Sequence, residues 1–339
     1  ASAAAVWIAL LTVALGTPAP PASGQSKTGT AIGQFLLIEP GARHAAMGNA
    51  AVARQDGLQS VYYNPAAIGA IERYGVQLTH SEWLAGITYD YASISLPALR
   101  WAGLFVSLTA LNSGEMDVRT VEQPHGTGER FDVSNVALGL GAGRRVTDRF
   151  FAGAQINYVQ ETIWNSSLET FTLNLGTLYR VSDDGLHLGA SVSNIGTKAG
   201  YEGRDLAMQY DNDPSRYGDN SALPGERFTG EFPLPVIFRV GLGKPWQINP
   251  RLRLWTEVDA FHPSDNTETV STGVELTWRD AWALRGGYDN LGRSDGESGL
   301  TLGGGVKLDV QTLDVEVDYC WADYGRLEET HRLTLVVMF

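Results

Sequence analysis

Five basic and six acidic residues in the second half of the chain could form a binding or conducting surface. Each falls on the polar side of a segment that alternates polar and apolar residues, and charges that line a pore can select ions. A wall whose charges are solvated or paired with one another is the simpler interpretation, and we prefer it. The residues are Arg239, Arg251, Arg253, Arg285 and Lys307, with Glu257, Asp259, Glu275, Asp314, Glu316 and Asp318.

The sequence contains no recognisable catalytic motif. G-x-S-x-G is missing, and the glycines of 139–143 lack the G-x-G-x-x-G spacing of a dinucleotide loop. The single Cys320 excludes an internal disulfide and a zinc site built on several cysteines. No metal-ligand spacing relates the six histidines, which are His44, His80, His125, His187, His262 and His331. We predict a non-enzyme without cofactor or metal; the alternative is a membrane phospholipase that assembles Ser and His from separate strands.

A net charge of −13 gives no basic surface for nucleic acid. Alternation continues from Tyr74 to the end of the chain in runs of about ten residues, the length of a tilted strand that crosses a bilayer. An even number of strands can close without an unpaired edge, so 74–339 is predicted to be an all-β transmembrane barrel. The strands are expected near 74–82, 86–96, 100–111, 131–144, 149–162, 168–181, 185–196, 233–243, 251–261, 268–279, 281–289, 297–308, 311–322 and 329–339.

The links between these strands alternate between short turns and longer loops, as in outer-membrane barrels of Gram-negative bacteria. The longer loops include 112–130, 197–232 and 290–296. Loop 197–232 carries Tyr201, Tyr210, Tyr217 and Phe228, and it could fold over the mouth, bind a partner or remain disordered. The last strand resembles the signal read by the barrel-assembly machinery, and its signal residues are Leu333, Leu335, Val337 and Phe339.

Residues 1–24 resemble a signal peptide, with an apolar run at 3–15 and small residues before a cleavage site. Residues 25–73 are predicted to be a plug segment, of which 33–70 fill the lumen. Many strand glycines share the inward parity and could admit this segment, although glycine could instead merely permit strand coiling. These glycines are Gly139, Gly141, Gly143, Gly153, Gly176, Gly189, Gly241, Gly243, Gly273, Gly287, Gly303 and Gly305.

The plug segment resembles the N-terminal signature of the PorV/PorQ family, which is related to the FadL-like channels. The similar residues are Arg43, Met47 and Gly48, followed by Asn64, Pro65 and Ala66. The resemblance implies a FadL-like barrel of about fourteen strands with an N-terminal lumenal plug. For PorV-type members it also implies a part in type IX secretion, in which the protein binds the C-terminal signal domains of exported cargo.

Three functions therefore stay open. The first is a non-enzymatic component of type IX secretion that contacts outer-membrane lipid, secretion-system proteins and cargo. The alternative is a FadL-like channel for hydrophobic small molecules. Such a channel needs an apolar pocket between plug and wall, and the inward residues are mainly glycine and charge, although the plug could supply apolar side chains. The third function is a scaffold for surface partners.

Overall fold

The computed structural model describes residues 29–99, 102–182, 185–211, 213, 215, 222–293, 297 and 299–339. The predicted signal peptide, residues 1–24, lies outside this range, as do the first four residues of the predicted plug segment. No helix among the described residues is long and apolar enough to cross a membrane.

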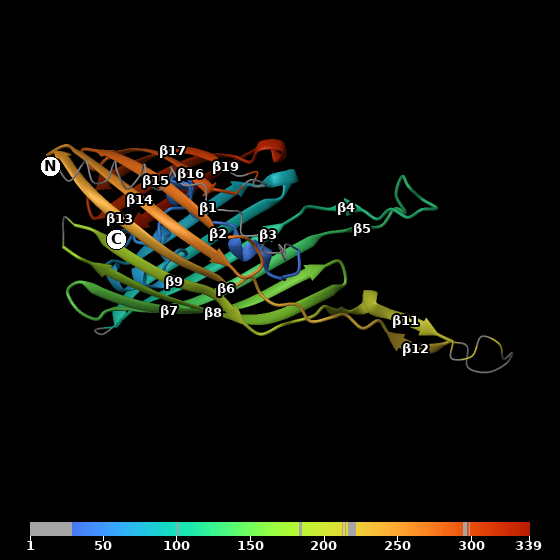
Figure 1. Ribbon diagram of the computed structural model, residues 1–339. Helices are drawn as coiled ribbons and strands as arrows, with labels where there is room; N and C mark the ends of the chain where they lie inside the picture. Colours follow the sequence, from blue (N-terminus) through green and yellow to red (C-terminus); the bar gives the residue numbers. More distant parts are fainter. Residues whose placement is uncertain are drawn as a thin grey trace.

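Fourteen antiparallel strands form a closed barrel, which confirms the predicted fold class (Figure 1). Each strand pairs with the next along the chain, and the last strand pairs with the first over the whole length of β1. The strands are β1 (Gly75–Glu82), β2 (Thr88–Leu99), β3 (Ala102–Asn112), β6 (Val133–Arg145), β7 (Phe150–Ile163), β8 (Ser166–Arg180), β9 (His187–Gly196), β13 (Ile237–Asn249), β14 (Leu252–Pro263), β15 (Thr269–Trp278), β16 (Trp282–Leu291), β17 (Leu300–Val310), β18 (Leu313–Asp323) and β19 (Glu329–Met338).

One strand boundary differs from its prediction by several residues at both ends. The strand expected at 233–243 begins at Ile237 and continues to Asn249. Pro233 and Pro235 have no backbone N–H to offer a neighbouring strand, so residues 233–236 lead into the barrel instead of forming part of it.

The outer wall is apolar because strand parity is kept along the barrel. In β15, the side chains of Val270, Val274 and Trp278 are 38–46% exposed, whereas Ser271 and Glu275 on the opposite face are at most 2% exposed. Apolar side chains that face outward around a closed barrel need a lipid environment.

Aromatic side chains gather at the barrel end that holds the C-terminus. Trp278 pairs with Trp282 across β15 and β16, and Phe150 pairs with Tyr179 across β7 and β8. Rings of this kind favour the headgroup zone of a bilayer, so this end of the barrel lies at a membrane surface.

The longer loops leave the opposite end of the barrel (Figure 1). One loop holds the short strands β4 (Met116–Asp117) and β5 (Arg130–Phe131), which pair with each other. Loop 197–232 holds β10 (Glu202–Gly203), η5 (Arg204–Leu206), β11 (Ala207–Tyr210) and β12 (Leu223–Glu226). Its β11–β12 hairpin extends away from the barrel, so the expectation that this loop folds over the mouth is not met (Figure 1).

The segment before β1 lies inside the barrel as a plug. Its short helices are η1 (Gln34–Leu37), α2 (Ala42–Ala45), η2 (Leu58–Ser60) and η3 (Pro65–Ala70), and η4 (Leu84–Gly86) follows β1 at the outer end. A Cβ atom added at any of the predicted inward glycines except Gly139 and Gly305 would come within 3.4 Å of a plug atom. At those two positions the space is taken by polar side chains of the wall itself. At the other ten positions, close approach of the plug leaves little or no room for a Cβ atom, so glycine there does more than permit strand coiling.

Candidate functional site

Two carboxylates of β14 bind three consecutive backbone amides of the plug. Asp259 Oδ2 accepts hydrogen bonds from the N–H groups of Ala51 at 2.7 Å and Val52 at 2.9 Å. Glu257 Oε1 accepts a hydrogen bond from the N–H of Ala53 at 2.7 Å. Both carboxylates are at most 1% exposed, so these bonds are shielded from water. A hydrogen bond within a protein contributes about 0.5–1.5 kcal/mol net, so the three bonds together hold segment 51–53 in place.

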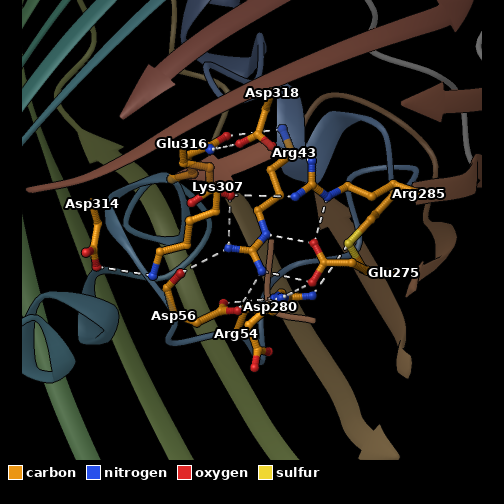
Figure 2. A network of polar contacts seen from close by, with 12 residues as sticks. Arg43, Arg54, Asp56, Glu275, Asp280, Arg285, Lys307, Asp314, Glu316 and Asp318 are labelled. Atoms are coloured by element: carbon orange, nitrogen blue, oxygen red, sulfur yellow. Dashed lines mark hydrogen bonds and ion pairs between the residues drawn. The ribbon is translucent and has the colours of Figure 1, made fainter. Parts of the chain in front are cut away.

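A buried ion network joins the middle of the plug to the same side of the wall (Figure 2). Glu275 of β15 pairs with Arg43 Nε at 2.8 Å, Arg54 Nη2 at 2.8 Å and Arg285 Nε at 2.7 Å. Within the plug, Asp56 accepts a hydrogen bond from Arg43 Nη2 at 2.9 Å. One wall carboxylate therefore compensates two plug arginines and one wall arginine.

The charges in the plug shift the protonation of its own side chains. Burial alone would raise the pKa of Asp56, but the charges of Arg43 and Arg54 outweigh burial and hold this pKa well below its usual range. Burial, reinforced by the same two arginines, lowers the pKa of His44 to about 3. His44 is therefore neutral at the centre of the plug, where its ring meets that of Tyr63 edge to face.

Most of the charged residues predicted on the inner wall are paired. Arg285 also contacts Asp318, Lys307 Nζ lies 3.1 Å from Asp314, and Arg253 lies 3.3 Å from Asp280. Arg239 donates a hydrogen bond to Ser193 and stacks over Tyr62 of the plug. Arg251 was wrongly assigned to this wall, since it lies exposed in the turn between β13 and β14, where strand parity ends. The structure thus favours a mutually paired wall over a lining of free charges.

The plug-motif residues lie at contacts between plug and wall. Gly48 has φ +63°, and its N–H donates a hydrogen bond of 2.8 Å to Thr301 Oγ1. Met47 is fully buried against two wall glycines of β15 and β16. Glycine is needed at position 48 both for its left-handed backbone and because a Cβ atom would lie 2.7 Å from the backbone of Tyr288.

The Asn-Pro-Ala element begins η3 and fastens it to the barrel. Asn64 Oδ1 accepts the N–H of Ala66 at 3.1 Å, and Asn64 Nδ2 donates to the backbone oxygen atoms of Val52 and Thr177, each at 2.9 Å. Pro65 stands at the start of the helix, where a missing N–H costs nothing.

The four predicted assembly-signal residues lie on the outer side of β19. Leu333, Leu335 and Phe339 are 53%, 37% and 54% exposed, and Val337 is partly exposed. The Phe339 ring stacks on Tyr74 at 6.1 Å, and its N–H donates to the Tyr74 carbonyl at 2.8 Å. These residues therefore form the seam at which the barrel closes.

Two chambers lie on either side of the plug, along the wall formed by β13–β18. The inner chamber, near the short turns, has a volume of about 460 Å³ and is lined by charged side chains, including Arg43, Arg253 and Glu316, among apolar ones such as Leu58 and Val336. The outer chamber, near the longer loops, has a volume of about 190 Å³. Between them, segment 46–54 of the plug packs directly on the wall glycines.

The base of loop 197–232 touches the start of the plug. Glu161 of β7 accepts a hydrogen bond from the N–H of Gly33 at 2.8 Å and another from the hydroxyl of Tyr201 at 2.9 Å. Ile32 packs with Leu234 in a small apolar cluster at the same place. One carboxylate therefore connects the external loop to the plug.

Sequence reasoning missed several residues that hold the plug. Glu161, Thr301 and Thr334 bind plug amides, and nothing in the surrounding strand sequence distinguishes them from other inward polar residues. Among the described residues, no group of three His, Cys, Asp or Glu side chains could hold a metal ion.

Solved structures of outer-membrane channels share this fold. The Pseudomonas putida toluene transporter TodX superposes with a TM-score of 0.54 at 14% identity, over 89% of this chain and 98% of that one. The Ralstonia pickettii toluene transporter TbuX gives 0.52 at 13%, over 89% and 98%. A Pseudomonas aeruginosa FadL homologue gives 0.52 at 14%, over 88% and 98%. Neither a protein-family model nor a curated protein sequence matches the chain.

The chain thus has the fold of the FadL-like outer-membrane barrels, and its apolar outer wall fits the bacterial outer membrane that was predicted. No sequence match supports the resemblance to the PorV/PorQ family, so that resemblance and the role in type IX secretion stay predictions.

Proposed function

We propose that this protein is a plugged outer-membrane channel for small, largely apolar molecules. The observation that carries the proposal is the pair of chambers in one sector of the wall, on either side of a plug whose segment 46–54 packs on the wall glycines. We infer that a path between the chambers opens when this segment leaves the wall and its contacts with Glu257, Asp259 and Glu275 are broken. The FadL-like fold supports the same function, since the neighbours named above include two toluene transporters.

One side of the outer chamber is apolar, although polar and charged residues line the rest of it. Leu37, Tyr62 and Tyr63 of the plug face Ile237 and Phe261 of the wall across it. The plug therefore contributes much of the apolar lining, and the composition of the strands alone understates how well the lumen can hold a hydrophobic molecule.

A disulfide between plug and wall offers a direct test. Ala46 packs against the buried Cys320 of β18 in one cluster, and a Cβ atom at the neighbouring Gly303 would lie 2.5 Å from the Cβ of Ala46. In an Ala46→Cys variant, oxidation can couple residue 46 to the native Cys320 and fix the plug to the wall.

We expect cells that make the wild-type protein to take up radiolabelled toluene faster than cells without it. Oxidised Ala46→Cys should lose this difference, and a reducing agent should restore it, whereas Ala46→Ser should behave like wild type under both conditions. Uptake that is no faster with the wild-type protein than without it would contradict the channel. Loss of surface attachment of type IX cargo in the oxidised variant, with toluene uptake unchanged, would favour the secretion role instead.

A further inference from the structure

A much smaller cavity adjoins the outer chamber. The larger cavity measures about 190 Å³ and the smaller about 10 Å³, and both are lined by Glu39, Asn49 and Asp289. An apolar cavity of roughly 150 Å³ holds a benzene molecule, and one of roughly 10–15 Å³ holds a single water-sized group. Together the two cavities match the size of a ligand that has a compact apolar body and one small polar group.

An arginine of the wall lines the smaller cavity with two nitrogen atoms that form no hydrogen bond. Arg332 of β19 is 4% exposed, and its Nε and Nη2 atoms form no hydrogen bond. Its guanidinium lies 5.8 Å from the ring centre of Trp83, which supplies an aromatic contact but no acceptor. Because a buried, unpaired cation is costly, the site is incomplete as it stands and requires an acceptor from elsewhere.

A plug carboxyl faces the same small cavity. Glu39 forms no ion pair with a described residue, although the charge of Arg332 acts on it. Burial raises the pKa of Glu39 to about 7, so near neutral pH this carboxyl can either donate or accept a hydrogen bond. The Arg332 guanidinium therefore offers a hydrogen-bond donor, and the Glu39 carboxyl offers a group that can donate or accept. The small cavity that both side chains line has room for about one oxygen atom.

The charges around the chamber select against ionic ligands. The carboxyl groups of Glu39, Asp265 and Asp289 disfavour an anion in the chamber. The guanidinium groups of Arg332 and Arg239 disfavour a cation. A hydroxyl group carries no charge, accepts a hydrogen bond from a guanidinium and donates one to a carboxylate. It can therefore form hydrogen bonds with Arg332 and Glu39 at the same time.

We propose that the outer chamber binds a small neutral molecule with an apolar body and one hydroxyl group, an alcohol or a phenol, whose oxygen lies between Arg332 and Glu39. The body lies in the larger cavity against Tyr62, Ile237 and Phe261. This inference rests on the proposed function and names its substrate class. The hydroxyl separates this class from plain hydrocarbons and from carboxylic acids.

Phenol and toluene form a matched pair of probes, because they differ by a hydroxyl in place of a methyl group. Binding of each to the full protein in lipid nanodiscs can be measured by equilibrium dialysis at pH 7.5, corrected for empty nanodiscs, with benzoate and benzylamine as charged probes. We expect the wild-type protein to bind phenol about tenfold or more tightly than toluene, as one hydrogen bond to a charged group allows, and to bind the charged probes more weakly than phenol.

Two substitutions test the site independently. Arg332→Met keeps a long side chain without donors, and Glu39→Leu removes the carboxyl from the plug side; each should bring the phenol-to-toluene ratio close to one. Glu39→Gln should keep the preference for phenol, since the amide can donate and accept. Arg149→Met, in an exposed turn at the other end of the barrel, is the matched control and should keep the wild-type ratio.

Equal binding of phenol and toluene by the wild-type protein would overturn the inference and leave a single water as the occupant of the small cavity. A preference for phenol that survives both Arg332→Met and Glu39→Leu would also overturn it. Uptake assays separate this result from the proposed function: toluene and phenol that both enter cells through the protein, without a difference in binding, would refute only the substrate class. Phenol that binds as expected while neither compound enters through the protein would refute the channel.

Discussion

Arg54 of the plug and Glu275 of β15 form an ion pair of 2.8 Å in which each side chain is only 2% exposed. The pair spans 221 residues of sequence, and the same carboxylate also compensates Arg43 and Arg285. Removing the Glu275 carboxylate would leave Arg43 and Arg54 to share the half-exposed Asp56, while Arg285 would keep Asp318. The docking of the plug should therefore depend strongly on this one side chain.

Glu275→Gln should destabilise the docked plug by about 3–5 kcal/mol, the usual effect of breaking a buried ion pair from one side. The measurement is the urea midpoint of the protein in lipid vesicles, together with protease cleavage within residues 29–73. Glu297→Gln, which breaks the exposed pair of Glu297 with Arg326, is the control and should leave both readings at the wild-type level. Equal effects of the two substitutions would contradict a central role for the buried network.

Two adjacent glycines of β16 should respond differently to substitution by alanine. A Cβ at Gly287 would overlap the backbone of Met47 in the plug, whereas a Cβ at Gly286 would meet nothing closer than 3.5 Å. Gly287→Ala should displace the plug at a cost of about 1–3 kcal/mol, and Gly286→Ala should not. Protease cleavage of the plug in otherwise folded barrels measures the difference. A plug that is equally protected in both variants would mean that its contact with β16 is dispensable.

Phe339→Ala should lower the amount of barrel inserted in the outer membrane while leaving export intact. The side chain is 54% exposed and stacks on Tyr74 at the closing seam, so its removal costs little packing once the barrel has formed. The expected pattern is less folded protein in the outer membrane with an unchanged urea midpoint for the fraction that is assembled. Normal insertion would show that the terminal residue is not an assembly signal.

Acid should loosen the plug through His44. The folded pKa of about 3 lies below the ordinary value of 6.5, so the stability this group contributes is complete above pH 6.5 and is lost as pH falls toward 3. At pH 4.5 the loss is on the order of 3 kcal/mol. His44→Phe keeps a ring against Tyr63 and should show a smaller change in urea midpoint between pH 7.5 and 4.5 than wild type. His125→Phe, in an exposed outer loop, should change by the same amount as wild type.

Strand positions could be predicted because the relevant signal is local. Whether Val274 faces lipid and Ser271 faces the lumen follows from the two-residue period of a strand, which any stretch of ten residues reveals. The same rule failed at Arg251, since a turn interrupts the period, and near Pro233, where the chain cannot yet pair. Both wrong predictions, at Arg251 and near Pro233, concern residues at the ends of strands.

The partners of the plug could not be predicted, because they depend on which strands surround it after closure. Asp259 was recognised as an inward charge, but its bond to the amide of Ala51 joins residues 208 positions apart. Glu39 and Arg332 come from the plug and the final strand, and no local pattern links them. Sequence alone therefore indicated that a plug exists without showing how it is held.

The contacts of the plug also fix the order in which the protein can assemble. Segment 42–66 binds β8, β9, β14, β15, β17 and β19, so its full set of contacts cannot form before the last strand is in place. The plug segment is synthesised before the strands, but it completes its docking only after the last strand is in place. Until then its amides and its arginines face water, and the segment is open to periplasmic proteases. Protection of residues 29–73 from cleavage therefore measures when the strands from β8 to the last one have assembled around the plug.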